Sequence, residues 1–448
     1  MNALDRDRLQ RYQEHLDFYN GIQWTGTAKR NERRLTFNYV KVNIDKLTSY
    51  LLSSLNFAID PVGNNPASVE AEEAIYQVYE DNNLEALDFE TEVDTAILGD
   101  GCYKVIWDQV EKRVRITAPD MRGIFVWWLG DDTAKIWRLA SRYELTDNEV
   151  RMIYGVVPTN KKCKVTEVWT DLTFDIWLDQ TQFLSQPNPY GFIPFVVFPN
   201  LRAPKQFWGV SDVPQMMESQ KEMNRALSQL SKILELSGNP IAVLENVAAS
   251  EDIKVQPGET WNIPEDSKAY LLDLLAGGGV RLHVDYIDLI YRTMHDISES
   301  PRAAFGGIER DLSGVALEIE LHPLLQKVKR KRTIRTTAYK RRNEFVLRLL
   351  ELYNNRSFGQ YSQRIIWGAI LPRDTSRITQ NEQMLVQSGV HSRRTAMDEL
   401  GIKDPDAEFT RWMDERARIL EQNNKLRARS TRGGERERIV SGEPEGID

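Results

Sequence analysis

Hydrophobic residues recur with helical spacing along the first hundred residues. In 38–54, Val40, Ile44, Leu47 and Leu51 are four, three and four positions apart, which places them on one face of a helix. Comparable patterns predict further helices over 3–19, 66–82 and 84–98. This part of the chain is therefore expected to be helical.

Between residues 102 and 198 the pattern becomes the two-residue alternation of β-strands. A short polar turn separates 102–108 from 113–119, and this predicts a β-hairpin. Thr146 is expected to cap a short helix that ends at Gly155. The remaining strands are predicted at 125–129, 136–145, 164–178 and 192–198.

Two longer helices follow, over 213–236 and 280–298. The first is about 36 Å long at 1.5 Å per residue. Its apolar seam has nearly heptad spacing with one polar member. The seam residues are Met216, Gln220, Met223, Leu227, Leu230 and Leu234. The two helices either pack on each other as an αα-hairpin within a monomer, or bury the seam against neighbouring copies of the chain.

Strand-like pieces separate these helices, and a longer helix follows the second. The pieces are 241–245, 252–263 and 268–274. Residues 313–354 predict a helix of about 63 Å. Pro323 lies inside it, so a kink is expected near 319–323.

The C-terminal region is predicted to start with a strand at 364–371 and then to become helical. Helices are expected over 375–388, 392–400 and 405–424. From 425 on the chain is rich in Arg, Glu and Gly with few apolar residues, which predicts a disordered tail.

Composition narrows the function. The 448 residues are 41% hydrophobic and 28% charged, with a net charge of −8. An acidic chain does not favour a tight, sequence-reading DNA protein. It is compatible with a surface past which DNA slides, because affinity for the duplex comes largely from phosphate neutralisation. No apolar run reaches the length of a membrane span, and the first residues predict no signal peptide.

Signatures of catalysis and metal binding are missing. There is no G-K-[ST] phosphate loop, no H-E-x-x-H motif and no Cys/His cluster. The two cysteines, Cys102 and Cys163, are too far apart in sequence for a disulfide framework, and a reducing cytoplasm is the simple interpretation. The five histidines are scattered. We expect a non-enzyme without catalytic residues, cofactor or metal site.

Four passages, taken in order, carry a family resemblance. The first is 207–246, in which Gln and Asn recur along a long helix after a Gly-x-Ser-Asp turn. The matching positions are Gly209, Ser211, Asp212, Gln220, Asn224, Asn239 and Pro240. The others are ISESP (297–301) followed by SGVAL (313–317), LRLLELYN (347–354), and 389–415. Together they resemble the portal proteins of tailed, siphophage-like bacteriophages.

The resemblance implies an α+β portal fold that assembles as a ring, usually of twelve subunits, at one capsid vertex. Its helical stem and crown would accompany an α/β wing and a small β-containing clip. The implied parts are wing 1–210, stem helices 211–237 and 280–301, clip 238–279, tunnel loop 302–312, a long kinked helix with the rest of the wing 313–372, crown 373–424 and tail 425–448.

The implied role is a channel through which a terminase motor packages double-stranded DNA and through which DNA later exits. Implied partners are DNA, the large terminase, head-completion and tail adaptor proteins, and the major capsid and scaffolding proteins, without a membrane. The implied location is the virion, and the host cytoplasm during assembly. The rival classes are another non-enzymatic capsid or scaffold protein, and a nucleic-acid-processing enzyme whose site has no recognised motif.

Three groups of residues are candidates for contacts, each with a plainer alternative. The tunnel loop would present Arg302, Phe305, Gly306, Gly307, Ile308, Glu309 and Arg310 to DNA, unless it is an ordinary surface loop. The basic run 327–342 holds nine cations, among them Lys329, Arg330, Lys331, Arg332 and Arg335. It either contacts DNA phosphates or forms a solvated or inter-subunit helix face that pairs with the acidic wing. In the clip, Val243, Trp261 and Tyr270 either anchor partners or form a small core.

Overall fold

The protein was analysed as a computed structural model. The structure describes residues 2–30, 32–53, 55–61, 67–158, 160–238, 241–245, 268–272, 279–306, 314–354, 356–359, 361–370, 375–402 and 405–440. The chain divides into two compact units. One comprises Met1–Leu52 and Phe57–Ile365, and the other comprises Ser53–Asn56 and Ile366–Asp448.

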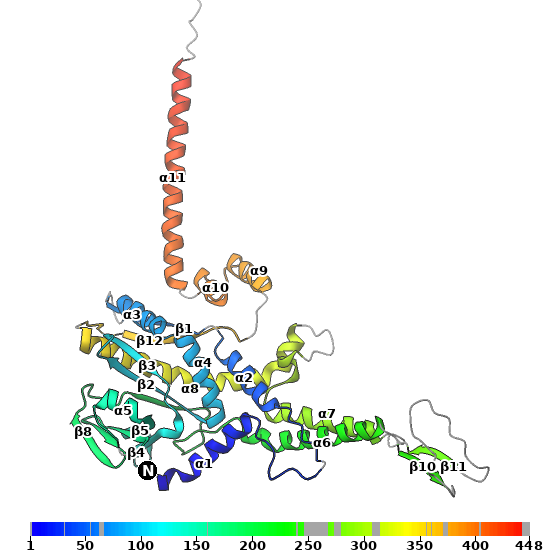
Figure 1. Ribbon diagram of the computed structural model, residues 1–448. Coiled ribbons are helices and arrows are strands. Elements are labelled where there is room, and N and C mark those ends of the chain that lie inside the picture. Colours follow the sequence, from blue (N-terminus) through cyan, green and yellow to red (C-terminus); the bar gives the residue numbers. More distant parts are fainter. Residues whose placement is uncertain are drawn as a thin grey trace, which may run out of the picture. The chain divides into compact units, whose positions relative to one another are not determined.

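The first unit begins with the predicted helices. They are α1 (Asn2–Tyr19), α2 (Tyr39–Leu51), α3 (Ala67–Asp81) and α4 (Leu84–Leu98). The spaced apolar residues of α2, from Val40 to Leu51, are buried, which confirms that its pattern marks a core-facing side. Helix α4 packs against both α1 and α2 (Figure 1).

Two antiparallel sheets follow. The hairpin of β2 (Asp100–Asp108) and β3 (Arg113–Thr117) is confirmed, and β9 (Phe195–Pro199) pairs with the other edge of β2. The short helix η1 (Met121–Gly123) leads to a five-stranded sheet in sequence order. Its strands are β4 (Ile124–Leu129), β5 (Asp132–Thr146), β6 (Lys162–Trp169), β7 (Thr173–Leu178) and β8 (Thr181–Pro187).

The predicted strand 164–178 is wrong as one element, because a turn divides it into β6 and β7. In this turn the Thr170 hydroxyl oxygen accepts the N–H groups of Leu172 and Thr173. The predicted cap of α5 (Asp147–Tyr154) is confirmed: Thr146 and Glu149 form a capping box, and Gly155 ends the helix in the left-handed region.

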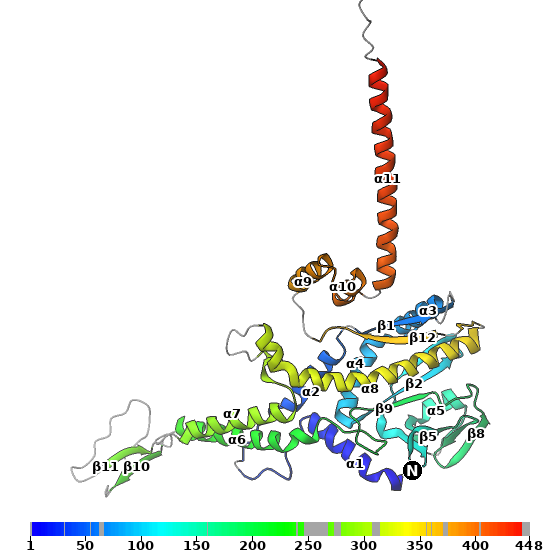
Figure 2. The same cartoon turned by 180° about the vertical axis from the view of Figure 1, so that it is seen from behind.

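The long helices are confirmed within a few residues. They are α6 (Pro214–Gly238), α7 (Gly279–Ile297) and α8 (Gly314–Asn354). Helix α8 contains Pro323, and its first turns run at an angle to the remainder, as expected for a proline kink (Figures 1 and 2). It packs against β2 and β9, with the Trp107 and Tyr353 rings stacked 4.9 Å apart.

Between α6 and α7, β10 (Ile241–Glu245) pairs with β11 (Lys268–Leu272), which confirms two of the three strand-like pieces. The third, 252–263, lies outside the described residues. A short helix, η3 (Arg302–Phe305), precedes α8. The strand predicted at 364–371 is found as β12 (Tyr361–Trp367), and it pairs with β1 (Leu55–Pro61), which the sequence did not predict.

The second unit contains α9 (Thr375–Gln387), α10 (Arg393–Glu399) and α11 (Pro405–Val440). Ser392 caps α10 by accepting the Thr395 N–H at 3.1 Å. Helix α11 extends to Val440, into the segment from 425 on for which the sequence predicts disorder, and 441–448 lie outside the described residues. Arg, Glu, Lys, Leu and Ala are good helix formers, so a low apolar content does not by itself argue against a helix.

Candidate functional site

The turn before α6 is seated on the end of α4. A side chain at Gly209 would collide with the backbone oxygen of Gly99, so backbone lies directly on backbone. Asp100 accepts the Gly209 N–H at 2.8 Å and the Tyr12 hydroxyl at 2.5 Å. Burial raises the pKa of Asp100 to about 6. The Ser211 hydroxyl donates to the Ile97 carbonyl at 2.5 Å, which anchors the start of α6.

Asp212 connects the start of α6 to α8. Its buried carboxylate is 2.9 Å from the ammonium of Lys327 and also pairs with Lys331. Burial by itself would raise the pKa of Asp212, but the two ammonium groups hold that pKa well below its usual range. Lys327 also donates to the Ser298 carbonyl at 3.0 Å, so the same contacts reach the end of α7.

Further along α8, two buried arginines pair with α4. Arg335 donates to both Glu92 oxygens at 2.8–2.9 Å and to the Asn200 carbonyl at 2.7 Å. Arg342 pairs with Asp88. With Lys327 and Lys331, these arginines form a row of cations along the buried side of α8, each with an acidic partner in the same chain. This row fixes α8 against α4 and the start of α6.

A second set of polar contacts holds an extended segment against α6. Gln220, Asn224 and Ser228 lie one helical turn apart and are buried. They accept the N–H groups of Tyr39, Phe37 and Leu35 at 3.1, 2.9 and 3.0 Å. Gln220 also donates to the Phe37 carbonyl. Gln220, the polar member of the predicted seam, together with Asn224 and Ser228 therefore replaces a missing strand partner for 35–39.

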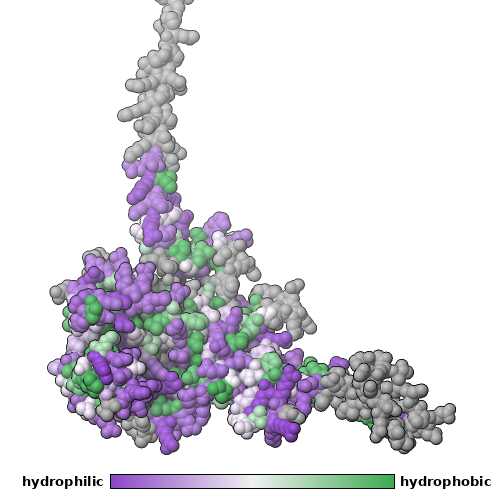
Figure 3. Space-filling view, in the orientation of Figure 1, coloured by the Kyte–Doolittle hydropathy of each residue, from purple (hydrophilic) through white to green (hydrophobic). Residues whose placement is uncertain are grey.

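Helices α6 and α7 pack on each other, so the αα-hairpin alternative describes the single chain. Near the body of the unit, Met216 and Met223 on α6 are buried, as are Ile290 and Met294 on α7. The Tyr286 hydroxyl donates to Glu222 at 3.1 Å. Farther along α6, Leu234 is 52% exposed. Figure 3 shows hydrophobic residues at the surface near the far end of this pair.

The base of the predicted tunnel loop is well ordered. His295 shares a 2.6 Å hydrogen bond with the Ser300 carbonyl, and its ring meets the Phe305 ring at 5.1 Å. Burial lowers the pKa of His295. The Arg302 guanidinium lies 5.5 Å from the Tyr291 ring centre, and Gly306 has a φ of 87°. The other predicted tunnel-loop residues, Gly307, Ile308, Glu309 and Arg310, lie outside the described residues.

The predicted basic patch is divided by the structure. Lys331 and Arg335 are buried in the ion pairs described above, and the buried Arg332 donates to the Leu51 carbonyl at 3.1 Å. Only Lys329 and Arg330 are exposed, and Arg330 pairs with Glu299 at 2.6 Å. This corrects the expectation of a continuous surface patch. The signal in the sequence was the spacing of Lys327, Lys331 and Arg335 on one helix face, the face that also carries core residues.

In the predicted clip, Val243 and Tyr270 are direct partners across the β10–β11 pair. The Tyr270 side chain is 46% exposed, and its hydroxyl donates to Glu245 at 3.4 Å. Trp261 lies outside the described residues. The two described positions thus share one site on the hairpin, with the tyrosine ring accessible.

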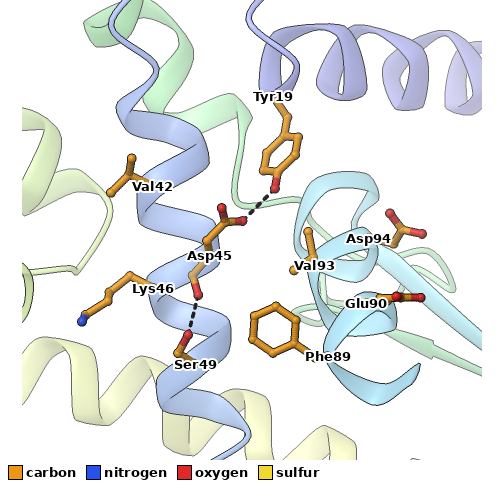
Figure 4. Close-up of a pocket in the computed structure, with 9 residues that line it drawn as sticks. All are labelled: Tyr19, Val42, Asp45, Lys46, Ser49, Phe89, Glu90, Val93 and Asp94. Carbon is orange, nitrogen blue, oxygen red and sulfur yellow. Dashed lines mark hydrogen bonds between the residues drawn. The ribbon is translucent and has the colours of Figure 1, made fainter. Parts of the chain in front are cut away.

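A crevice of about 790 Å³ lies between α1, α2 and α4 (Figure 4). Asp45 stands at its centre and accepts the Tyr19 hydroxyl at 2.7 Å. Glu90 and Asp94 line the α4 side, and burial raises the pKa of Asp94. Among the described residues, no group of three His, Cys, Asp or Glu side chains is placed to hold a metal ion. The crevice was not foreseen from the sequence.

A family model described as "Phage portal protein, SPP1 Gp6-like" matches residues 3–422. The chain belongs to this portal protein family, as the four sequence passages predicted. No curated protein matches it.

Membership of the portal family establishes the general role of the chain. The chain is a phage portal protein, of a family that is generally structural and associates with the capsid at a vertex of the virion. Ring assembly, and contact with DNA and terminase, belong to that family in general. The mixed helix and sheet content agrees with the predicted α+β fold. No helix in the described part of the chain is long and apolar enough to cross a membrane.

Proposed function

We propose that this chain forms a ring, of twelve copies as is usual in the family. Double-stranded DNA would pass through its central channel during packaging by the terminase and during later exit. The observation that carries the proposal is the α6–α7 pair. Its far end holds the β10–β11 hairpin and its near end holds the base of the loop that begins at Arg302. These two helices would be the stem, 238–279 the clip and 302–312 the tunnel loop.

The remaining assignments follow from this arrangement. The sheets with α1–α4 and α8 would form the wing, and the helices after 373 the crown. The clip, with Tyr270 exposed, would dock the large terminase and afterwards the head-completion or tail adaptor proteins. The ring would assemble with capsid and scaffolding proteins in the host cytoplasm. The chain itself would guide DNA and catalyse nothing.

Electron microscopy of the purified chain tests the ring. Rings with a central hole are expected, together with no ATPase or nuclease activity. Shells, filaments or monomers would favour another capsid or scaffold protein. Robust hydrolysis by the chain alone would favour a nucleic-acid-processing enzyme.

The tunnel loop has its own test in the double substitution of Gly306→Ala and Gly307→Ala. Gly306 lies in the left-handed region, where an alanine is strained by roughly 1–2 kcal/mol. We expect intact rings but a fall of about tenfold or more in the amount of packaged DNA. A factor of ten corresponds to about 1.4 kcal/mol in the free energy of one packaging step. The matched control is Gly155→Ala, which also has a left-handed φ and open space around it. Equal DNA yields from both variants would reject the assignment.

A further inference from the structure

Residues 23–38, here called the basic loop, form a compact loop whose ends meet. Gln23 donates to the Asn38 side chain at 3.0 Å. Within the loop, Arg34 donates to the Gly26 carbonyl at 2.8 Å and its guanidinium lies 5.4 Å from the Trp24 ring centre. Surface loops of this length that are packed by their own side chains are frequently functional.

The basic loop is also fixed to α6. Asn224 donates to Gln23 at 2.6 Å, and the Leu35 and Phe37 N–H groups donate to Ser228 and Asn224. The loop therefore keeps one position relative to the α6–α7 pair. A partner that binds it meets a preformed surface and orders little chain, which favours affinity.

The surface of the basic loop is cationic and flanked by apolar groups. Four cations face one acid within it in an otherwise acidic chain: Lys29, Arg30, Arg33 and Arg34 against Glu32. The Lys29 and Arg30 side chains are exposed, and no ion-pair partner of either is found among the described residues. At the ends of the loop, Ile22 is 66% and Phe37 41% exposed. Its partner should therefore offer both carboxylates and apolar side chains.

The outer side of α7 has these properties. Leu282, Asp285 and Leu289 follow at helical spacing and are all exposed. No ion pair of Asp285 is found in the described part of the chain. Leu282 and Leu289 are large apolar side chains exposed on this side of the helix, and the α6–α7 packing does not account for them.

The basic loop and helix α7 lie on opposite sides of α6. In both views α6 runs between α7 and the loop, drawn in dark blue (Figures 1 and 2). Because α6 separates them, the basic loop and the outer side of α7 cannot contact each other within one subunit. The basic loop of one subunit can contact α7 of the next. Contacts between two different surfaces of identical subunits produce closed rings when the rotation closes.

We infer that the basic loop of one subunit docks on the outer side of α7 of the next subunit, with Arg30 paired to Asp285 of the neighbour and Ile22 and Phe37 against its Leu282 and Leu289. The inference rests on the proposed ring. On this inference, Gln220, Asn224 and Ser228 of α6 hold the basic loop in position for a contact between subunits.

Disulfide trapping tests the contact directly. Copies carrying Arg30→Cys are mixed with copies carrying Asp285→Cys, assembled and oxidised. Both native cysteines are buried and free, so the new thiols are the reactive ones. A covalent dimer is expected on a non-reducing gel. Neither variant alone should give it, nor should Lys135→Cys, an exposed residue of β5, mixed with Asp285→Cys.

Charge exchange provides the second test. Arg30→Glu or Asp285→Arg alone should raise the subunit concentration for half-assembly about fivefold to tenfold, as for a contact of about 1 kcal/mol. The double variant should recover most of the loss, and salt should weaken the unmodified ring. Rings that form normally without trapping or rescue overturn the inference and leave the proposed function intact. An unmodified chain that forms no ring overturns both. A packaging defect with unchanged ring stability assigns the loop to DNA instead.

Discussion

Two runs of cations in this protein look alike in sequence and behave differently in the structure. The run at 327–342 holds nine cations, and those on one face of α8 are buried against Asp88, Glu92 and Asp212. In the run at 29–34, Lys29, Arg30 and Arg33 are exposed, and Arg33 pairs with the exposed Glu235 at 3.4 Å. Arg34 is half-buried and pairs with Glu32 at 3.1 Å. A basic run therefore does not indicate a nucleic-acid surface until its acidic partners within the chain are known.

The difference has a physical basis in solvation. A buried charge loses its water, so it must be paired within the fold, and removing its partner is costly. An exposed charge keeps its water and contributes little to the subunit, but it remains available to another molecule. We expect substitutions in the two runs to affect different quantities, the first subunit stability and the second association.

The largest effect is expected for Arg335→Met. This substitution leaves the Glu92 carboxylate buried without its bidentate partner, which costs about 3–5 kcal/mol. Urea denaturation of the purified chain measures the change. Arg330→Ala, which removes an exposed pair on the same helix, should cost less than about 1 kcal/mol. Similar losses from both variants would contradict the division of α8 into a buried and an exposed side.

Lowering the pH is expected to have an intermediate effect on the free energy of unfolding. Because Lys327 and Lys331 hold the pKa of Asp212 below its unfolded value of about 3.9, its contribution to stability is complete above that value and is lost as the pH falls below it. The loss should be on the order of 2 kcal/mol.

Unfolding free energies measured between pH 5 and pH 3 test this expectation. Asp212→Asn should be less stable than the unmodified chain at pH 5, and its stability should fall less steeply towards pH 3. Equal slopes would show that Asp212 does not carry the acid sensitivity.

The smallest effect on the subunit is expected for Arg33→Ala in the basic loop. Its pair with Glu235 is exposed on both sides, so the free energy of unfolding should change by less than about 0.5 kcal/mol. Thermal unfolding of the dissociated chain measures it. A loss above about 1 kcal/mol would mean that the basic loop is part of the core and not an accessible docking surface.

Much of the fold was predictable because its signals are local. The apolar spacing of α2, the capping box of α5 and the glycines that end helices depend on neighbouring residues alone. Strand β8 has a largely exposed side-chain pattern and gave no alternation, and the turn at Thr170 was hidden inside a continuous run of strand formers.

The candidate site was predicted in outline and not in its contacts. Gln220 stood out as the polar member of an apolar seam and Asn224 as a position of the family motif, but their partners lie about 180 residues earlier in the chain. Arg302 and Phe305 of the predicted loop lie in the short helix η3, and the packing of these two residues on Tyr291 and His295 depends on how α7 ends.

By itself, the sequence determined most of the succession of helices and strands, the absence of recognised catalytic motifs and, through four ordered passages, the portal family. Local propensity and spacing suffice for these. The tertiary structure alone decided which cations of α8 are buried, what the polar residues of α6 hold, and that the basic loop and α7 present opposite sides of one helix pair. These features depend on pairing between residues far apart in sequence. Desolvation and geometry, and not composition, determine whether a charge is paired within the chain or is exposed to a neighbouring subunit.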